Sequence, residues 1–262
     1  MKIGIFDSGL GGLVITKACI NALPVYDYVY FGDTRNLPYG EKTSGQILAY
    51  SLEAMRYLIS QQCSLIIIAC NTATSIALRY IQQRFIPAYA PEVKVLGVVI
   101  PTVETAIDSG EKKIGVAATR ATVRSGIYAT ELHKLNPEVW VKEVATPELV
   151  PAIEHNDFAA AEEIVLRYLP QFAEAESVIL GCTHYPLVKH LFRRYLPATV
   201  KVVSQDELMG AKLADYLRRH SEIETRLSRG ARYRFVVSSL NEHYRQVAAT
   251  LFADIPIEEI SA

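Results

Sequence analysis

The chain has 262 residues, of which 50% are hydrophobic and 21% are charged, as is usual for a folded globular protein. Its length allows one large domain or two small ones. Glycine (14) and proline (12) are too few for a disordered or fibrous chain. The 27 Lys and Arg residues nearly balance the 28 Asp and Glu residues, so the net charge is −1. This balance argues against binding of nucleic acid or of an acidic membrane, and it favours a small-molecule site.

The four cysteines, Cys19, Cys63, Cys70 and Cys182, are too few for a disulfide scaffold, and no two form a C-x-x-C pair. We therefore expect reduced thiols. The first apolar run, residues 3–6, is too short for a secretion signal, and no apolar run reaches the roughly 18 residues of a membrane span. We expect a cytoplasmic protein with no membrane partner.

In chain order, short apolar runs rich in β-branched residues alternate with longer segments of helical period, which indicates an α/β fold with mostly parallel sheets. The predicted strands are residues 2–6, 28–31, 65–69, 93–100, 113–117, 139–144, 177–180, 200–203 and 233–237. The predicted helices are residues 44–62, 73–84, 122–135, 158–172, 187–195, 208–218 and 242–252. Ligands of such folds bind at the carboxyl ends of the strands, so the residues there are the candidates for chemistry.

Two segments recur at nearly the same spacing. Residues 2–5 (KIGI) resemble residues 113–116 (KIGV), and residues 65–70 (LIIIAC) resemble residues 177–182 (SVILGC). The repeat predicts two similar α/β domains related by a pseudo-twofold axis, with the active site in the cleft between them. We expect residues 1–96 together with 207–262 to form the first domain and residues 97–206 to form the second.

Cys70 and Cys182 each follow a predicted strand and precede residues suited to a helix start. A thiol at a helix N-terminus has its thiolate favoured by free N–H groups, so we expect its pKa to move towards neutrality. The same N–H groups, with the side chains of Asn71, Thr72 and Thr183, are candidates to hold a carboxylate. Cys19 and Cys63 lie inside predicted helical stretches, and we interpret them as small buried hydrophobic residues.

Several other polar residues follow predicted strands. Asp7 is a candidate to relay the proton of Cys70 or to hold a substrate ammonium group; a structural turn with an N-cap is the less favoured alternative. Tyr39 is a candidate wall of the site. Thr119 and Thr122 are suited either to bind a carboxylate or to cap a helix. His184 is placed to share a proton with Cys182, and Glu154 is a candidate to orient its imidazole. The sequence has no recognisable metal-ligand spacing and no nicotinamide or flavin fingerprint, so we expect side-chain chemistry without a cofactor.

Four motifs in this order resemble the cofactor-independent aspartate/glutamate racemase family: residues 5–12 (IFDSGLGG), residues 32–40 (GDTRNLPYG), residues 69–73 (ACNTA) and residues 181–186 (GCTHYP). The resemblance spans most of the chain. It implies interconversion of L- and D-glutamate, with D-glutamate supplied to peptidoglycan synthesis by a homodimeric enzyme. It also implies that Cys70 and Cys182 are the two bases, the first serving D-glutamate and the second L-glutamate. Asp7 would assist Cys70, and His184 with Glu154 would assist Cys182. The implied substrate contacts are Asp7, Ser8, Tyr39, Gly40, Asn71, Thr72, Thr119, Thr122, Thr183 and His184.

Three alternatives stay open on sequence grounds. Aspartate is the other substrate of the same chemistry. A cysteine hydrolase would use Cys182 and His184, which leaves Cys70 without a role. A carboxylate-binding module without catalysis would leave both thiols unexplained.

Overall fold

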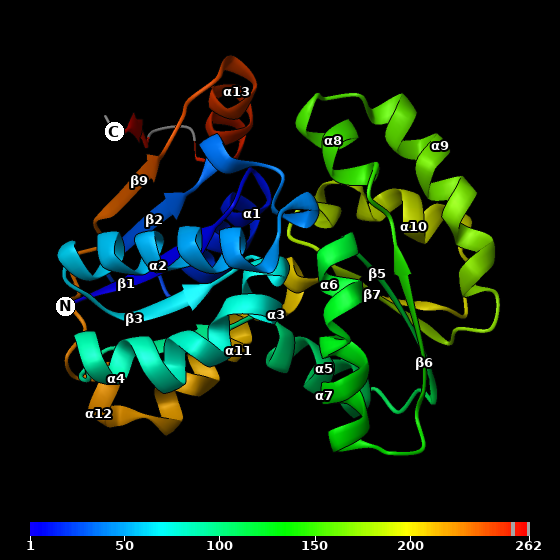
Figure 1. Cartoon of the computed structure of the whole chain (residues 1–262), viewed down its shortest axis with the longest axis horizontal. Coiled ribbons are helices and arrows are strands. Elements are labelled where there is room, and N and C mark those ends of the chain that lie inside the picture. Colours follow the sequence, from blue (N-terminus) through cyan, green and yellow to red (C-terminus); the bar gives the residue numbers. More distant parts are fainter. Residues whose placement is uncertain (253–254, 261–262) are drawn as a thin grey trace.

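The computed structural model describes residues 1–252 and 255–260, which form two lobes, each built on a parallel sheet (Figure 1). The larger sheet has the strand order β10-β9-β2-β1-β3-β4 and the smaller has the order β6-β5-β7-β8. The strands of the larger sheet are β1 (Lys2–Asp7), β2 (Tyr28–Gly32), β3 (Cys63–Ile68), β4 (Lys94–Gly97), β9 (Tyr233–Val237) and β10 (Ile257–Glu259). Those of the smaller sheet are β5 (Lys113–Ala118), β6 (Trp140–Ala145), β7 (Ser177–Gly181) and β8 (Lys201–Val203).

The two sheets repeat one arrangement of four strands. In the larger sheet β1 lies between β2 and β3, and β3 pairs with β4; in the smaller sheet β5 lies between β6 and β7, and β7 pairs with β8. The register repeats too, because Ile3 lies opposite Leu65 and Ile114 lies opposite Ser177. These pairs confirm the repeat inferred from the sequence.

Helices cover both sheets and join the lobes. They are α1 (Gly11–Ala22), α2 (Ser44–Ser60), α3 (Asn71–Tyr80), α4 (Ile86–Tyr89), α5 (Val99–Asp108), α6 (Arg120–Ser125), α7 (Ile127–Leu135), α8 (Leu149–Glu154), α9 (Phe158–Tyr168), α10 (Lys189–Tyr195), α11 (Gln205–Arg219), α12 (Ser221–Glu224) and α13 (Glu242–Leu251). One cluster of buried apolar side chains includes Ile5 of the larger sheet, Val116 of the smaller sheet, Val103 of α5 and Leu213 of α11. The lobes therefore share part of their core.

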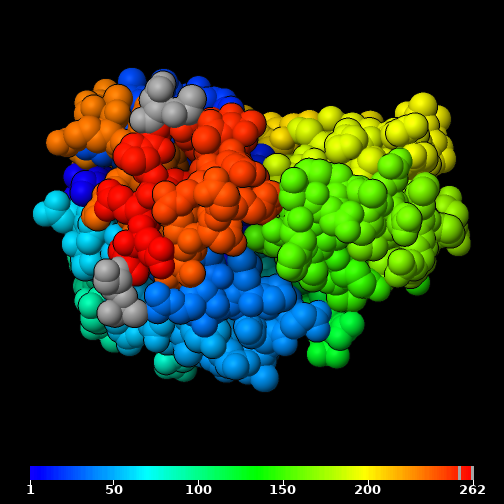
Figure 2. Space-filling model, turned by 90° about the horizontal axis from the view of Figure 1, so that it is seen from above, coloured from blue at the N-terminus to red at the C-terminus, as the bar shows by residue number. Residues whose placement is uncertain are grey.

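The C-terminal segment returns to the first lobe. Strand β9 pairs with β2, and α11 packs against α1. Figure 2 shows this orange and red segment on the blue lobe, beside the green and yellow second lobe. We propose that the lobes are domains of residues 1–96 with 207–262 and of residues 97–206; residues 253–254 and 261–262 of that division lie outside the described residues.

Several predicted boundaries were wrong. The strand predicted at 93–100 ends at Gly97, because Val99 begins α5. The helix predicted at 122–135 is divided at Gly126, whose left-handed backbone (φ +63°) ends α6 and precedes α7. The elements α1, α4, α5, α8, α12 and β10 were not predicted from the sequence. Helix α1 begins with two glycines and α8 has only six residues including a proline, so neither has a strong helical pattern. In the described part of the chain, no helix is long and apolar enough to cross a membrane.

Candidate active site

A small cavity between the lobes contains most of the predicted site residues. Its lining is Ser8, Leu37, Pro38, Tyr39, Gly40, Cys70, Asn71, Thr72, Thr119, Val150, Cys182, Thr183 and His184. The predicted residues Asp7, Thr122 and Glu154 do not line the cavity but contact residues that do. Leu37, Pro38 and Val150 were not predicted to line the site, because their apolar side chains carry no chemical signal of their own. The cavity encloses about 20 Å³, which is room for roughly one water molecule.

Cys70 comes directly after the buried strand β3 and caps the N-terminus of α3. Its Sγ accepts a hydrogen bond from the backbone N–H of Ala73 at 3.4 Å and lies 3.5 Å from Oγ of Ser8. Its side chain is buried, and burial together with the nearby Asp7 carboxylate raises its pKa to about 12. The expectation that the helix N-terminus would bring this pKa towards neutrality was wrong. Burial and a neighbouring negative charge outweigh the two hydrogen bonds that favour the thiolate.

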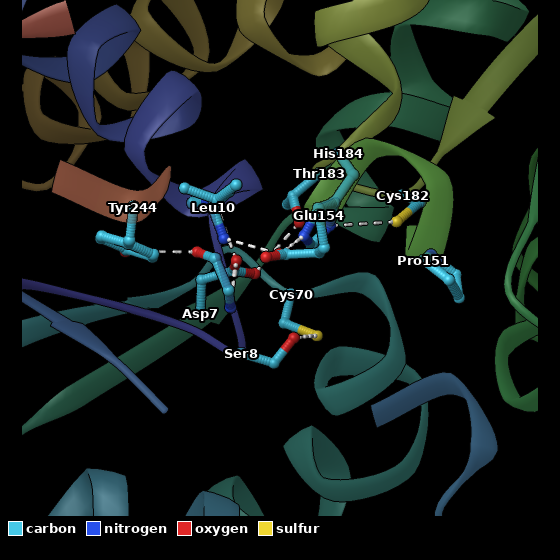
Figure 3. Close-up of polar contacts among 12 residues, drawn as sticks. Asp7, Ser8, Leu10, Cys70, Pro151, Glu154, Cys182, Thr183, His184 and Tyr244 are labelled. Atoms are coloured by element: carbon cyan, nitrogen blue, oxygen red, sulfur yellow. Dashed lines mark hydrogen bonds and ion pairs between the residues drawn. The ribbon is translucent and has the colours of Figure 1, made fainter. Parts of the chain in front are cut away.

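Cys182 directly follows the equivalent strand of the second lobe, β7, but has different neighbours. A 3₁₀ turn (Tyr185–Val188) follows it where a helix start was predicted, and α10 begins only at Lys189. Its Sγ lies 3.7 Å from Nδ1 of His184, whose Nε2 pairs with Oε1 of Glu154 (Figure 3). The three predicted residues Cys182, His184 and Glu154 are therefore brought into one line of contacts.

The pair formed by His184 and Glu154 places a buried positive charge beside Cys182. Burial disfavours the charged imidazole, but the Glu154 carboxylate raises the pKa of His184 well above its ordinary value. Burial also opposes ionisation of Glu154, yet the His184 charge and the hydrogen bonds to Glu154 lower its pKa. One of those hydrogen bonds comes from the backbone N–H of Leu10 in the first lobe, at 3.2 Å. An imidazolium in this position is the kind of neighbour that stabilises a thiolate.

Asp7 ends β1 and is completely buried at the junction of the lobes. Its Oδ2 accepts hydrogen bonds from the backbone N–H groups of Gly9 (3.0 Å) and Gly12 (2.8 Å), at the start of α1. Its Oδ1 accepts one from Oγ1 of Thr183 in the second lobe at 3.1 Å. Burial raises its pKa, against the opposing effect of the His184 charge. Asp7 thus links the first strand of one lobe to the loop that carries Cys182.

Hydroxyl groups from both lobes meet on another side of the cavity. Oγ1 of Thr72 lies 2.8 Å from Oγ1 of Thr119 and 3.3 Å from that of Thr122. Thr119 also caps α6, so the capping function considered from the sequence is present as well. Gly40 packs against Thr119, and Oη of Tyr39 donates a hydrogen bond to Oδ2 of Asp33 at 2.6 Å. These hydroxyl and backbone groups are suited to hold a carboxylate.

The side chain of Asn71 forms its hydrogen bonds with residues that do not line the cavity. Its amide forms two hydrogen bonds with Gln205, and Oη of Tyr128 donates a third to its Oδ1. Neither Gln205 nor Tyr128 was identified from the sequence. Among the residues that the structure describes, no group of three or more His, Cys, Asp or Glu side chains is arranged to hold a metal ion.

Comparison with known proteins matches this arrangement to one family. The family described as Asp/Glu/Hydantoin racemase matches residues 20–205. The chain is 37% identical over 239 residues to the glutamate racemase of Geobacter metallireducens, covering 89% of this chain and 86% of that protein. Two solved structures are similar over nearly the whole chain. Glutamate racemase isoform RacE1 from Bacillus anthracis has a TM-score of 0.89 at 28% identity, covering 99% of this chain and 97% of the other. Glutamate racemase from Francisella tularensis in complex with D-glutamate has a TM-score of 0.87 at 32% identity, covering 100% and 97%.

Proposed function

Since the chain belongs to the Asp/Glu/Hydantoin racemase family, we propose that it interconverts L- and D-glutamate by a two-base proton transfer between Cys70 and Cys182. The observation that carries this proposal is that two buried thiols, from equivalent strand ends of the two lobes, line one cavity. Inversion at Cα requires a base on one face of the carbon and an acid on the other. Paired thiols on opposite walls supply both without a cofactor.

The surroundings of the two thiols suggest how the proton is distributed before reaction. Because its pKa is about 12, Cys70 carries its proton at neutral pH. His184 offers its positive charge to Cys182, which suits a thiolate there. With L-glutamate, the Cys182 thiolate would take the Cα proton to form S–H, while the Cys70 S–H bond breaks and its proton bonds to the opposite face of Cα. With D-glutamate the same two transfers run in reverse. Asp7 would assist Cys70, and His184 with Glu154 would assist Cys182.

We propose that the substrate is held by Asp7, Ser8, Tyr39, Gly40, Asn71, Thr72, Thr119, Thr122, Thr183 and His184. A cavity of about 20 Å³ is too small for glutamate, so the lobes must separate to admit it. Contacts between the lobes around the cavity would break in that motion. They include the exposed ion pair of Glu41 with Arg120 (3.2 Å) and the hydrogen bond of Asp7 with Thr183. The hydrogen bond of Leu10 with Glu154 and the contact of Thr72 with Thr119 are others. We further propose a cytoplasmic homodimer whose D-glutamate serves peptidoglycan synthesis.

A cysteine hydrolase is the second candidate, because the structure places Cys182, His184 and Glu154 in contact as a thiol, an imidazole and a carboxylate. That function uses only one thiol. It therefore predicts that Cys70 can be replaced without loss of activity, whereas a two-base racemase requires both cysteines.

The deciding experiment is incubation of the purified protein with L-glutamate in D2O, without pyridoxal phosphate. D-Glutamate carrying deuterium at Cα is expected, and its absence would contradict the proposal. A parallel reaction with L-aspartate decides between the two substrates by the larger kcat/KM.

Substitution of the two thiols tests the bases. Cys70→Ala and Cys182→Ala are each expected to abolish racemisation, since each removes one proton carrier. Cys63→Ala is the matched control, because this thiol is also buried but lies outside the cavity. Near-normal turnover by either active-site variant would contradict the assignment of both bases.

A further inference from the structure

Behind the cavity, four buried polar side chains from four helices form one hydrogen-bond network. Nδ2 of Asn71 donates to Oε1 of Gln205 at 2.8 Å, and Nε2 of Gln205 donates back to Oδ1 of Asn71 at 2.9 Å. Nε2 of Gln205 also lies 3.1 Å from Oγ1 of Thr102, and Oη of Tyr128 donates to Oδ1 of Asn71 at 2.7 Å. Gln205, Thr102 and Tyr128 are fully buried, and Asn71 is nearly so.

The pairing of the two amides is specific in orientation. Each amide presents its N–H group to the oxygen of the other, so the pair forms only when the two side chains face each other in one way. Water cannot replace either bond at this depth, and a buried amide without partners is costly. The start of α11 is therefore fixed against the start of α3.

The network touches the chain next to both catalytic thiols. Asn71 directly follows Cys70, which caps α3. On the other side, the ring of Tyr128 packs on Gly181, which directly precedes Cys182; a Cβ atom at Gly181 would lie only 3.0 Å from Cε2 of the ring. A line of contacts therefore runs from the neighbour of one thiol, through Asn71 and Tyr128, to the neighbour of the other.

We propose that Gln205 is a positioning residue, which, through its amide pair with Asn71, holds Cys70 in alignment with Cys182 across the cavity. The inference rests on the proposed two-base reaction and adds a residue to which that proposal assigns no role. Gln205 does not line the cavity, so it acts through Asn71 and not on the substrate. Because its oxygen and nitrogen are both engaged, a residue with only one of these functions cannot take its place.

Two variants of Gln205 separate positioning from simple stabilisation. Gln205→Leu removes the whole pair, and Gln205→Glu keeps the shape but sets a carboxylate oxygen against Oδ1 of Asn71. Tyr128→Phe is a milder change that removes one hydrogen bond and keeps the ring on Gly181, and it serves if the Gln205 variants fold poorly. Ser51→Ala is the control, because it removes a fully buried hydroxyl of α2 that donates only to the backbone of Ile47 and is not part of this network.

The readout is the kinetic isotope effect of glutamate deuterated at Cα, measured in both directions. If Cys70 is out of line, the carbanion made by Cys182 more often takes back the deuteron that this thiol still holds, so delivery of a proton from Cys70 limits the rate. The isotope effect on conversion of deuterated L-glutamate should therefore fall, and that on deuterated D-glutamate, whose deuteron Cys70 removes, should rise. In both directions kcat per folded enzyme should fall about tenfold. Ser51→Ala should change none of these values.

A merely structural role would lower the amount of folded enzyme but leave both isotope effects at their wild-type values. That result in Gln205→Glu or Tyr128→Phe would overturn the positioning role. Failure of the proposed function looks different, because the wild-type enzyme itself would then place no deuterium in D-glutamate.

Discussion

Replacing Glu154 with glutamine tests whether the Glu154 carboxylate keeps His184 positively charged beside Cys182. The wild-type carboxylate pairs with Nε2 of His184 and accepts the backbone N–H of Leu10. Glutamine keeps the size and one acceptor oxygen but removes the negative charge. Since that charge is what raises the pKa of His184 against the effect of burial, the pKa should fall and the imidazole should become neutral near pH 8.

The size of the effect follows from replacing a hydrogen bond between charged groups by a neutral one. A buried hydrogen bond between charged groups contributes about 1.5–3 kcal/mol. At about 1.4 kcal/mol for each tenfold change in rate, kcat/KM at pH 8 should fall about 10- to 150-fold. The fall must be equal for L- and D-glutamate. The two are enantiomers of equal free energy, so the ratio of their kcat/KM values is fixed at one for every variant.

Circular dichroism polarimetry of both enantiomers between pH 6 and pH 9 measures this. The rate of Glu154→Gln should rise, relative to wild type, as the pH falls, because protonation restores the cation on His184. Wild-type His184 should keep its charge to higher pH than the variant, since the Glu154 carboxylate raises its pKa well above the ordinary value. Glu148→Gln is the control, because this carboxylate lies just before α8 but is exposed and bonds Tyr168. A fall in kcat/KM of less than about threefold, or a pH profile parallel to that of wild type, would refute this role of Glu154.

Two further substitutions test the junction of the lobes and a buried acid. In Gly11→Ala, the new Cβ would lie 2.2 Å from the carbonyl carbon of Thr183. The backbone of Thr183 cannot move aside as a flexible side chain can, so the lobes should be forced apart and kcat/KM should fall at least about tenfold. Gly45→Ala is the control, because a Cβ atom there would meet nothing within 4 Å. Near-normal turnover of Gly11→Ala would contradict the close packing of the lobes. For the buried acid, burial raises the pKa of Glu143 on β6 to about 7. Because the folded pKa exceeds the unfolded one, stability is lost as the pH rises from about 4.5 through 7, and Glu143→Gln should avoid that loss. In urea unfolding, the free energy of unfolding of Glu143→Gln should exceed that of wild type by about 1 kcal/mol at pH 8 and equal it at pH 4. The figure at pH 8 is set low because the Glu143 side chain is partly exposed to solvent. Equal stability of the two proteins at both pH values would contradict the raised pKa of Glu143.

The sequence was informative where structure depends on local pattern. Buried parallel strands are mostly apolar, so every strand except the short edge strand β10 was predicted. The repeat was visible too, and with it the equivalent positions of Cys70 and Cys182. The contact of Glu154 with His184 was also predicted correctly, although it joins α8 to the loop after β7.

What the sequence could not show depends on contacts between distant segments. The high pKa of Cys70 comes from burial and from Asp7, and neither follows from the residues beside Cys70. The partner of Asn71, Gln205, is 134 residues away, between the strand predicted at 200–203 and the helix predicted at 208–218. One signal was available: Gln205 follows the last strand of the second lobe as Asn71 follows a strand of the first, so a polar amide stood at an equivalent edge of each sheet.

The repeat reproduces the backbone around the thiols but not their electrostatic surroundings. Cys70 faces Ser8 and a nearby carboxylate, whereas Cys182 faces an imidazolium. Such asymmetry is compatible with a reaction between mirror images, because thermodynamics fixes only the ratio of kcat/KM and leaves kcat and KM free to differ together. The substrate itself is also asymmetric in the site, since its side chain lies on one side of Cα. The two proton transfers therefore start from different ground states, and a different partner for each thiol is what an enzyme would need to bring both barriers to similar height.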